Sequence, residues 1–400
     1  MKVGIILVGT ELLNGDIVDT NSQYIQNFLL SYGMDSVLKV VVKDQLEEIV
    51  EAIKFVENKV DLLIMSGGLG PTFDDITRDA IAKFYSVPLC VDEKAYEVMS
   101  TYFQNRKMEM PENNIRQVML PKGCQVVENH VGVAPGFYIG KILALQGVPR
   151  ELVDGLHRFI ESRFEKADSK EKFDILLYGA AESIVEDRII DIIKRYESEF
   201  EFEILARPYG IILRVVFSDS QRSLAVKVAE EIEKRVEEFV FGHGQERLES
   251  VLLNLLDEAG VRISVAESCT GGLIAASFTA IPGSSKSFEE GIVTYSNQSK
   301  SERLGVCESV LARFGAVSQE CVKEMLKGLK TPVKIAVSGI AGPAGGTKEK
   351  PVGLVYIGIE VNGSVKVMEY YFGGERVMIQ NRAKNQALFE VIKLIKECSK

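Results

Sequence analysis

Apolar runs and helically spaced apolar residues alternate through the first 165 residues. This alternation predicts a parallel sheet with right-handed crossover helices, because each helix carries the chain back to start the next parallel strand. Ligands of such sheets bind at the carboxyl ends of the strands. The predicted elements are strands at 2–8, 37–42 and 61–65, and helices at 21–32 and 46–57.

A second pattern, of alternating strands and two helices, occupies residues 170–244. A charged stretch, Glu161–Lys172, precedes it and is interpreted as a linker. The predicted order is similar to a small KH-like α+β module, and nucleic-acid-binding KH modules clamp the backbone with a GXXG loop. Here the segment Gly179–Glu182 lacks the second glycine, so we favour a spacer or dimerisation module over an RNA binder. The predicted elements are strands at 173–177, 200–205 and 211–217, helices at 182–196 and 224–240, and a turn at 208–210.

The third block begins near Gln245 and returns to an α/β pattern. Apolar spacing predicts a first helix over 248–259, a strand at 261–266 and a last helix over 375–397. Asn362-Gly363 between two strand-like runs predicts a hairpin. The expected architecture is therefore α/β, with an N-terminal Rossmann-type domain at 1–168, a KH-like module at 169–244 and a C-terminal α/β domain at 245–400.

Composition narrows the classes of partner. The net charge of −10 argues against a nucleic-acid partner, because phosphate binding requires a basic face. No apolar run approaches the ~20 residues of a membrane span, and the first residues lack a signal-peptide pattern, so we expect a cytoplasmic protein without a membrane partner. The six cysteines form no C-x-x-C pair and there are three histidines, so we expect reduced thiols and no zinc site.

Ala266–Gly272 is the first candidate for chemistry. It follows a predicted strand, opens a helix and is rich in glycine, so it exposes a side chain beside free backbone N–H groups that suit an oxyanion or a phosphate. Ser268, Cys269 and Thr270 are the candidate nucleophiles. The alternative interpretation is simple helix capping by Ser268 or Thr270.

A nucleophilic serine needs a base, and the chain from Gln245 onward contains no histidine. A Ser-His-Asp triad within this domain is therefore excluded, which leaves a lysine whose pKa is lowered by burial. Lys300 follows a predicted strand at 291–295 and is one candidate, although by itself it is better explained as an ordinary surface lysine. A second Gly-rich loop, Ser338–Pro343, follows the predicted strand 333–337 and can approach a ligand closely.

The motifs AESCTGG, VTYSNQSK, GAVS, SGIAGPAGG and KPVG occur in this order along the third block. This set resembles the C-terminal domain of the CinA competence/damage-inducible family, which is similar to the stand-alone nicotinamide-mononucleotide deamidase PncC. The resemblance implies a metal-free serine/lysine amidohydrolase with Ser268 as nucleophile, Lys300 as general base and Tyr295 supporting the base. It implies a nucleotide site shaped by Thr270, Gly271, Gly272, Ser338, Gly339 and Arg376. The chain departs from the family pattern at Gln380, where an arginine is usual and where Arg382 is a possible substitute.

A polar Gly-rich loop, Ser66–Thr77, follows the strand at 61–65 in the first block. Its glycines can cradle a phosphate, and Asp74 and Asp75 could hold a divalent cation that bridges to it. The alternative is a capped helix start. The run resembles the molybdopterin-binding fold of the MogA and MoeA proteins, in which Asp75 and Asp44 match functional carboxylates. The stretch 9–13, which contains Glu11, is typical of the CinA branch.

The resemblance covers essentially the whole chain and implies two activities. The third block would convert nicotinamide mononucleotide (NMN) to nicotinic acid mononucleotide and ammonia. The first block would hydrolyse ADP-ribose, with Mg or Co on Asp44, Asp74 and Asp75 and with the substrate on Glu11, Gly67, Gly68, Gly70 and Thr72. Molybdopterin chemistry and a non-enzymatic role in DNA uptake or repair are the alternatives. We expect a homodimer, formed through the first block.

Overall fold

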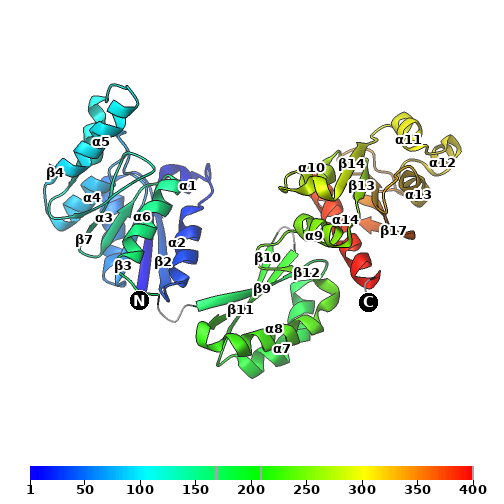
Figure 1. The fold of residues 1–400 in the computed structure, drawn as a ribbon, viewed down its shortest axis with the longest axis horizontal. Helices are drawn as coiled ribbons and strands as arrows, with labels where there is room; N and C mark the ends of the chain where they lie inside the picture. The colour runs from blue at the N-terminus through cyan, green and yellow to red at the C-terminus, as the bar shows by residue number, and fades with distance from the viewer. Residues whose placement is uncertain (167–169, 208–209, 399–400) are drawn as a thin grey trace. The chain divides into compact units, whose positions relative to one another are not determined.

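The computed structural model describes residues 1–166, 170–207 and 210–398. The chain divides into two compact units, one of residues 1–171 with 218–220 and the other of 172–217 with 221–400 (Figure 1). The second unit contains both the predicted middle module and the third block. None of the helices in the described ranges is long and apolar enough to cross a membrane.

A six-stranded sheet forms the first unit, and its strand order confirms the predicted parallel arrangement for four strands. Strands β2, β1, β3 and β8 run parallel, whereas β7 and β6 continue the sheet antiparallel. Apolar clusters fill both faces, with α3 and α4 over one face and α2 and α6 over the other. The strands are β1 (Lys2–Val8), β2 (Asp35–Val42), β3 (Leu62–Ser66), β6 (Gln125–Val127), β7 (Gly136–Ile139) and β8 (Ile142–Leu145).

The helices of the first unit agree with the two that the apolar spacing predicts and add several more. A separate two-stranded ladder, β4 (Leu89–Val91) with β5 (Met119–Pro121), lies outside the main sheet. The helices are α1 (Thr10–Asn14), α2 (Asn21–Leu30), α3 (Leu46–Glu57), α4 (Thr77–Tyr85), α5 (Glu93–Asn105), the 3-10 helix η1 (Glu112–Val118) and α6 (Pro149–Glu161).

The middle module is a four-stranded sheet with two helices on one face. Two predictions about it are wrong. The predicted linker already forms structure at its end, because Lys170 begins a strand, and the predicted helix 224–240 ends at Arg235, after which Val240 starts a strand. Pro208 and Tyr209 of the predicted turn lie outside the described residues. The elements are β9 (Lys170–Leu177), α7 (Glu182–Tyr196), β10 (Glu201–Arg207), β11 (Gly210–Ser218), η2 (Asp219–Gln221), α8 (Arg222–Arg235), η3 (Glu237–Phe239) and β12 (Val240–His243).

The third block has a five-stranded sheet in the order β14-β13-β15-β16-β17, in which the first three strands are parallel and the last two antiparallel. Asn362 and Gly363 both have positive φ, 48° and 88°, as the predicted two-residue hairpin requires. The strands are β13 (Ile263–Glu267), β14 (Phe288–Val293), β15 (Val333–Gly339), β16 (Leu354–Val361) and β17 (Ser364–Tyr371).

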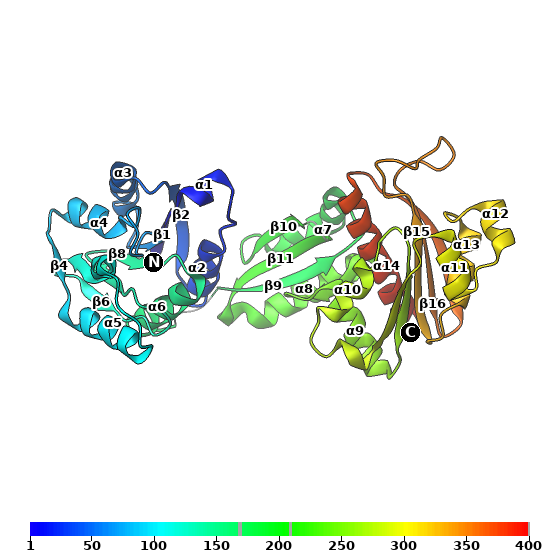
Figure 2. The ribbon, with the colours of Figure 1, turned by 90° about the horizontal axis from the view of Figure 1, so that it is seen from above.

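Helices cover both faces of this sheet (Figure 2). The face that carries α9, α10 and α14 buries the larger apolar cluster, and α11, α12 and α13 cover the other. The helices are α9 (Leu248–Ala259), α10 (Leu273–Thr279), η4 (Ser284–Lys286), α11 (Asn297–Leu304), α12 (Glu308–Phe314), α13 (Gln319–Lys327) and α14 (Arg376–Cys398).

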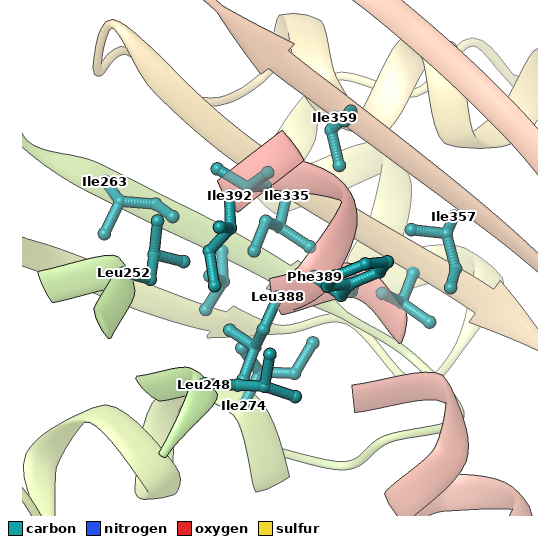
Figure 3. Packing of buried hydrophobic residues seen from close by; sticks show 14 of the residues in the cluster. Leu248, Leu252, Ile263, Ile274, Ile335, Ile357, Ile359, Leu388, Phe389 and Ile392 are labelled. Carbon is teal, nitrogen blue, oxygen red and sulfur yellow. The ribbon is translucent and has the colours of Figure 1, made fainter. Parts of the chain in front are cut away.

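The larger cluster joins the middle module to the third block. Figure 3 shows its centre, where Leu388, Phe389 and Ile392 of α14 lie among isoleucines of the sheet and leucines of α9. Leu176 and Phe241 of the module belong to the same cluster. Full burial of one such side chain contributes about 1.5–3 kcal/mol. The module is therefore packed onto the third block through a shared core.

Candidate active site and the pocket of the first unit

The turn after β13 presents Ser268 at the carboxyl end of the parallel strands. The Ser268 N–H donates to the carbonyl of Val337 on β15 at 3.0 Å, which extends the sheet contact one residue past the strand. Gly271 and Gly272 then take left-handed conformations, with φ of 64° and 99°, which other residues adopt only with strain. The backbone thus bends sharply between β13 and the following helix. Ser268 lies in this bend with 8% of its surface exposed.

Lys300 is fully buried and lies against Ser268. Its Nζ is 3.0 Å from Ser268 Oγ and donates to the carbonyl of Thr294 at 2.6 Å. Burial lowers the pKa of Lys300, because a charged ammonium is costly to remove from water. The sequence predicted that the strands leading to these two residues run side by side, and the parallel pairing of β13 with β14 confirms it. The predicted strand 291–295 differs in its bounds, since β14 ends at Val293. Lys300 lies beyond it, in helix α11.

Glu267, the last residue of β13, is a buried carboxylate that the sequence reasoning missed. It accepts hydrogen bonds from the backbone N–H groups of Gly272 at 3.0 Å, Ile274 at 3.1 Å and Ala275 at 2.9 Å. These are the free N–H groups of the first turn of α10, so Glu267 ties the helix start to the strand end. A charged residue directly before Ser268, at the end of a buried strand, was the signal that could have indicated it.

Cys269 and Thr270, the other two candidate nucleophiles, are both buried beside Ser268. Cys269 is buried in the main apolar cluster, and burial raises the pKa of its thiol to about 12, so the thiolate form is strongly disfavoured. Thr270 is also buried, and its Oγ1 has no hydrogen-bond partner within the described part of the chain. Of the three candidate nucleophiles, Ser268 alone has a hydrogen-bonded amine beside it.

None of the hydrogen bonds among the described residues joins Tyr295 to Lys300, so they give no support to the expectation that Tyr295 assists the base. Tyr295 is 63% exposed, and its hydroxyl accepts a hydrogen bond from Arg376 Nη2 at 2.9 Å. Arg376 Nη1 donates to the carbonyl of Gly342 at 2.7 Å. Arg376 begins α14, so the first turn of this helix is linked to the loops after β14 and β15.

Ser338 and Gly339 lie inside β15, which corrects the prediction that they begin a ligand-binding loop. Ser338 is fully buried and its hydroxyl donates to the carbonyl of Ala316 at 2.7 Å. A Cβ atom at Gly339 would stand 2.7 Å from the carbonyl of Leu354 on the neighbouring strand. The Ser338 side chain is therefore tied to the loop before α13, and Gly339 lies close to the backbone of β16.

Gln380 and Arg382 occupy the second turn of α14. Gln380 Nε2 donates to the carbonyl of Cys269 at 2.8 Å, so it contacts the turn that carries Ser268. Arg382 Nη1 donates to the carbonyl of Gly373 at 2.5 Å, before the helix begins. The expectation that Arg382 substitutes for an arginine at position 380 finds no support in this contact, because Gln380 itself makes the link to the turn.

A separate pocket of about 610 Å³ opens in the first unit. Its lining includes the carboxyl ends of β1, β3 and β8, where a ligand of a doubly wound sheet is expected. Every residue that the sequence predicted for this block lines it: Glu11, Asp44, Gly67, Gly68, Gly70, Thr72, Asp74 and Asp75. The sequence therefore located this pocket, although not its whole lining.

Hydrogen bonds already hold two of the carboxylates in this pocket. Asp44 Oδ2 accepts from both the N–H and the hydroxyl of Thr10 at 2.8 Å, and Asp75 Oδ2 accepts from the N–H of Thr72 at 2.8 Å. Within residues 1–166, 170–207 and 210–398, no three His, Cys, Asp or Glu side chains are grouped closely enough to hold a metal ion. Asp44, Asp74 and Asp75 thus share the pocket without forming a ready-made ligand cluster.

The Gly-rich loop that lines this pocket is held by a residue that carried no motif signal. The buried Arg78 donates to the carbonyls of Leu69 at 2.6 Å and Gly70 at 2.7 Å, and so fixes the Gly-rich loop. Further polar side chains come from segments distant in sequence, so spacing along the chain could not have indicated them. These lining residues are Tyr102, Asn114, Gln117 and Gln146; Glu151, which ends the stretch 147–151 that is typical of the CinA branch, also lines the pocket.

Comparisons with known proteins agree with both halves of this arrangement. A family pattern described as a probable molybdopterin binding domain matches residues 4–166, and one described as the CinA C-terminal domain matches residues 245–395. The chain is thus a multidomain α/β protein with a molybdopterin-binding-like first domain. It belongs to the CinA family.

Full-length relatives and one solved structure illustrate the extent of the match. A CinA-like protein of Fusobacterium nucleatum is 40% identical over 99% of both chains, and a CinA-like protein of Kosmotoga olearia is 39% identical over 97% of both. A crystallised competence/damage inducible protein of Agrobacterium tumefaciens is 40% identical, with a TM-score of 0.36, over 37% of this chain and 93% of its own.

Proposed function

We propose that the third block is an amidohydrolase that converts NMN and water to nicotinic acid mononucleotide and ammonia. The observation that carries this proposal is the 3.0 Å contact between the buried amine of Lys300 and the hydroxyl of Ser268. A serine beside a lysine with a lowered pKa is a nucleophile beside a base, and it needs neither histidine nor metal. The similarity of the motifs to the PncC deamidase supplies the substrate.

The reaction takes two steps. Neutral Lys300 takes the proton of Ser268 as Oγ attacks the carboxamide carbon, and then gives that proton to the departing ammonia. A water molecule next attacks the acyl-enzyme. Lys300 takes a proton from the water and returns it to Ser268 Oγ as the acyl–oxygen bond breaks, which releases the acid product and free Ser268. Every proton passes through the single nitrogen that contacts Ser268 Oγ.

Arg376 gives the nucleotide a cationic contact in this proposal. It lies at the start of α14, where the helix dipole also favours an anion, and a guanidinium can bind a phosphate through two N–H groups. Its bonds to Gly342 and Tyr295 connect it to loops beside the turn at Ser268.

Ammonia release by the full-length chain tests this function. Purified protein with NMN should release ammonia and nicotinic acid mononucleotide in equal amounts, and Ser268→Ala should release neither. An inert wild-type protein would refute the substrate. Equal activity of wild type and Ser268→Ala would show a contaminating enzyme or a different nucleophile.

For the first unit, we propose metal-dependent hydrolysis of ADP-ribose to AMP and ribose 5-phosphate. The supporting observation is the charge of the pocket, whose lining contains five carboxylates, Glu11, Asp44, Asp74, Asp75 and Glu151, and no lysine or arginine. A diphosphate would be repelled there without a cation. Oxygen ligands suit Mg, or Co as the alternative, and such an ion would neutralise the diphosphate oxygens. Hydrolysis should require added metal, whereas metal-independent cleavage would contradict the proposal.

The remaining expectations belong to the same proposal. The two nucleotides are the partners, a cytoplasmic homodimer is the working form, and nucleic acid and membranes are not bound. A molybdopterin-binding role for the first unit is the second candidate, since the matched family pattern carries that description. Competition between a pterin and ADP-ribose for this unit would distinguish the two.

A further inference from the structure

The turn that carries Ser268 has two backbone N–H groups that donate to no backbone carbonyl within the described part of the chain, those of Cys269, which lies against its own thiol, and Thr270. The N–H groups of the following helix start are occupied, because Glu267 accepts from Gly272, Ile274 and Ala275. A tetrahedral intermediate on Ser268 carries a negative oxygen, and fixed N–H groups are the usual donors to it. The turn itself therefore supplies the candidate oxyanion donors.

Gln380 fixes the direction of one of these donors. A trans peptide is planar, so its carbonyl and its N–H point in opposite directions. The peptide between Cys269 and Thr270 is trans, since Gly342-Pro343 is the one cis bond found in the described ranges. Gln380 Nε2 holds the Cys269 carbonyl at 2.8 Å, and the N–H of Thr270 must then point away from α14.

We propose that Gln380 is a positioning residue of the amidase, which orients the Thr270 N–H toward the oxyanion through the Cys269 carbonyl. This inference rests on the proposed function of the third block. It also explains how the chain tolerates glutamine where the family usually has arginine, because either side chain can donate to that carbonyl. The requirement at position 380 is then an N–H donor of the right reach, and a positive charge is not needed for this role.

Variants of Gln380 distinguish a side chain that acts as a hydrogen-bond donor from one that only fills space. Gln380→Met keeps the length of the side chain and removes the donor, so kcat for NMN should fall by about tenfold or more, less than the ~10²–10³-fold of a deleted oxyanion donor. KM should stay within about twofold, because the substrate carboxamide is bound before the oxyanion forms. Gln380→Arg should restore kcat. Gln386→Met is the matched control, since Gln386 lies on the same helix and contacts Tyr370 and Glu390 instead.

A second readout does not depend on NMN. An alkyl fluorophosphonate reacts when Ser268 Oγ bonds to phosphorus, fluoride leaves and the serine proton passes to Lys300, and its phosphoryl oxygen takes the place of the oxyanion. Labelling of Ser268, followed by mass spectrometry of the full-length chain, should slow in Gln380→Met by the same factor as kcat and recover in Gln380→Arg.

Two outcomes would overturn the inference, and a third would refute the proposed function alone. Labelling of Gln380→Met at the wild-type rate would overturn it, whether or not NMN is a substrate. A fall that Gln380→Arg does not restore, accompanied by a lower melting temperature, would show a structural role and overturn it too. A wild-type protein that labels normally but releases no ammonia from NMN would refute the proposed function alone, and the labelling rates would still decide the role of Gln380.

Discussion

Lys300→Met is the most informative single change, because it removes the amine and keeps an unbranched apolar side chain in a space without solvent. Lys300 is 0% exposed and its nitrogen is the amine beside Ser268 Oγ, so the variant leaves that hydroxyl without a base. General-base contributions are typically ~10²–10⁴-fold, and here one group serves both steps, so we expect kcat to fall by ~10³-fold or more. Lys300→Arg should fail equally, because a guanidinium does not deprotonate.

The same change should leave the fold as stable or more stable. Loss of Nζ leaves the Thr294 carbonyl without its partner, which costs about 1–3 kcal/mol. Against this, the variant no longer buries a group that is charged in the unfolded chain, and a buried ion costs several kcal/mol. Thermal unfolding followed by circular dichroism should therefore show a melting temperature equal to or above that of the wild type.

The lowered pKa also gives two dependences on pH. Activity needs the neutral amine, so kcat should rise with pH until it passes the pKa of Lys300 in the folded protein. The folded state binds fewer protons than the unfolded state between that lowered pKa and the ordinary value of 10.5, so the free energy of unfolding should also rise with pH across this window. Lys300→Met should lose this contribution to the slope.

Clear results would refute this reasoning. Ammonia release by Lys300→Met near the wild-type rate would leave Ser268 without the base assigned here. If Lys300→Met does not fold, Lys300→Gln takes its place in the test. Glutamine is smaller, neutral and polar, and this variant should fold and stay inactive. Lys327→Met, at an exposed lysine of α13 whose ion pair with Glu324 lies at the surface, is the control and should change neither activity nor stability.

The remaining predictions concern the nucleophile, its neighbours and the first unit. Ser268→Ala should lower amidase turnover by at least ~10³-fold, whereas Cys269→Ser should keep it; the reverse result in ammonia assays would exchange their roles. Glu267→Gln should lower kcat by about tenfold or more, because an amide NH2 repels the N–H groups of α10, and unchanged kinetics would make Glu267 a packing residue. A chelator should spare ammonia release and abolish ADP-ribose hydrolysis, and loss of both would contradict the metal-free amidase.

The sequence predicted the buried strands well, because a strand covered on both faces is a continuous apolar run. Strands β1 and β3 are of this kind, and the hairpin at Asn362-Gly363 followed from local turn chemistry. The missed strands are short. Strands β6 to β8 have three or four residues each, too few for a periodic pattern, and β12 was absorbed into the apolar spacing of the helix before it.

The candidate sites were predictable to the extent that they lie in contiguous motifs. The Gly-rich loops at Ser66–Thr77 and Ala266–Gly272 indicated both locations. The partners of individual side chains were not predictable, because they depend on packing between segments far apart. Tyr295 meets Arg376, 81 positions later, instead of the nearby Lys300, and Gln380 meets Cys269 across 111 positions.

The third block contains no histidine and buries Lys300, and both features follow from the use of a lysine as the base. A histidine base is orientated and stabilised by a carboxylate, which holds the positive charge that forms when it takes a proton. Lys300 has only uncharged acceptors, Ser268 Oγ and the Thr294 carbonyl, among the hydrogen bonds of the described residues. Burial is the largest influence on the pKa of Lys300 and lowers it toward the range where an amine can act as a base, whereas the buried thiols of Cys321 and Cys269 act in the opposite direction. A carboxylate introduced beside Lys300 would stabilise the ammonium and so disable the base, whereas the same carboxylate would help a histidine. This opposite requirement explains why Glu267, only one residue from Ser268, directs its charge toward the N–H groups of α10.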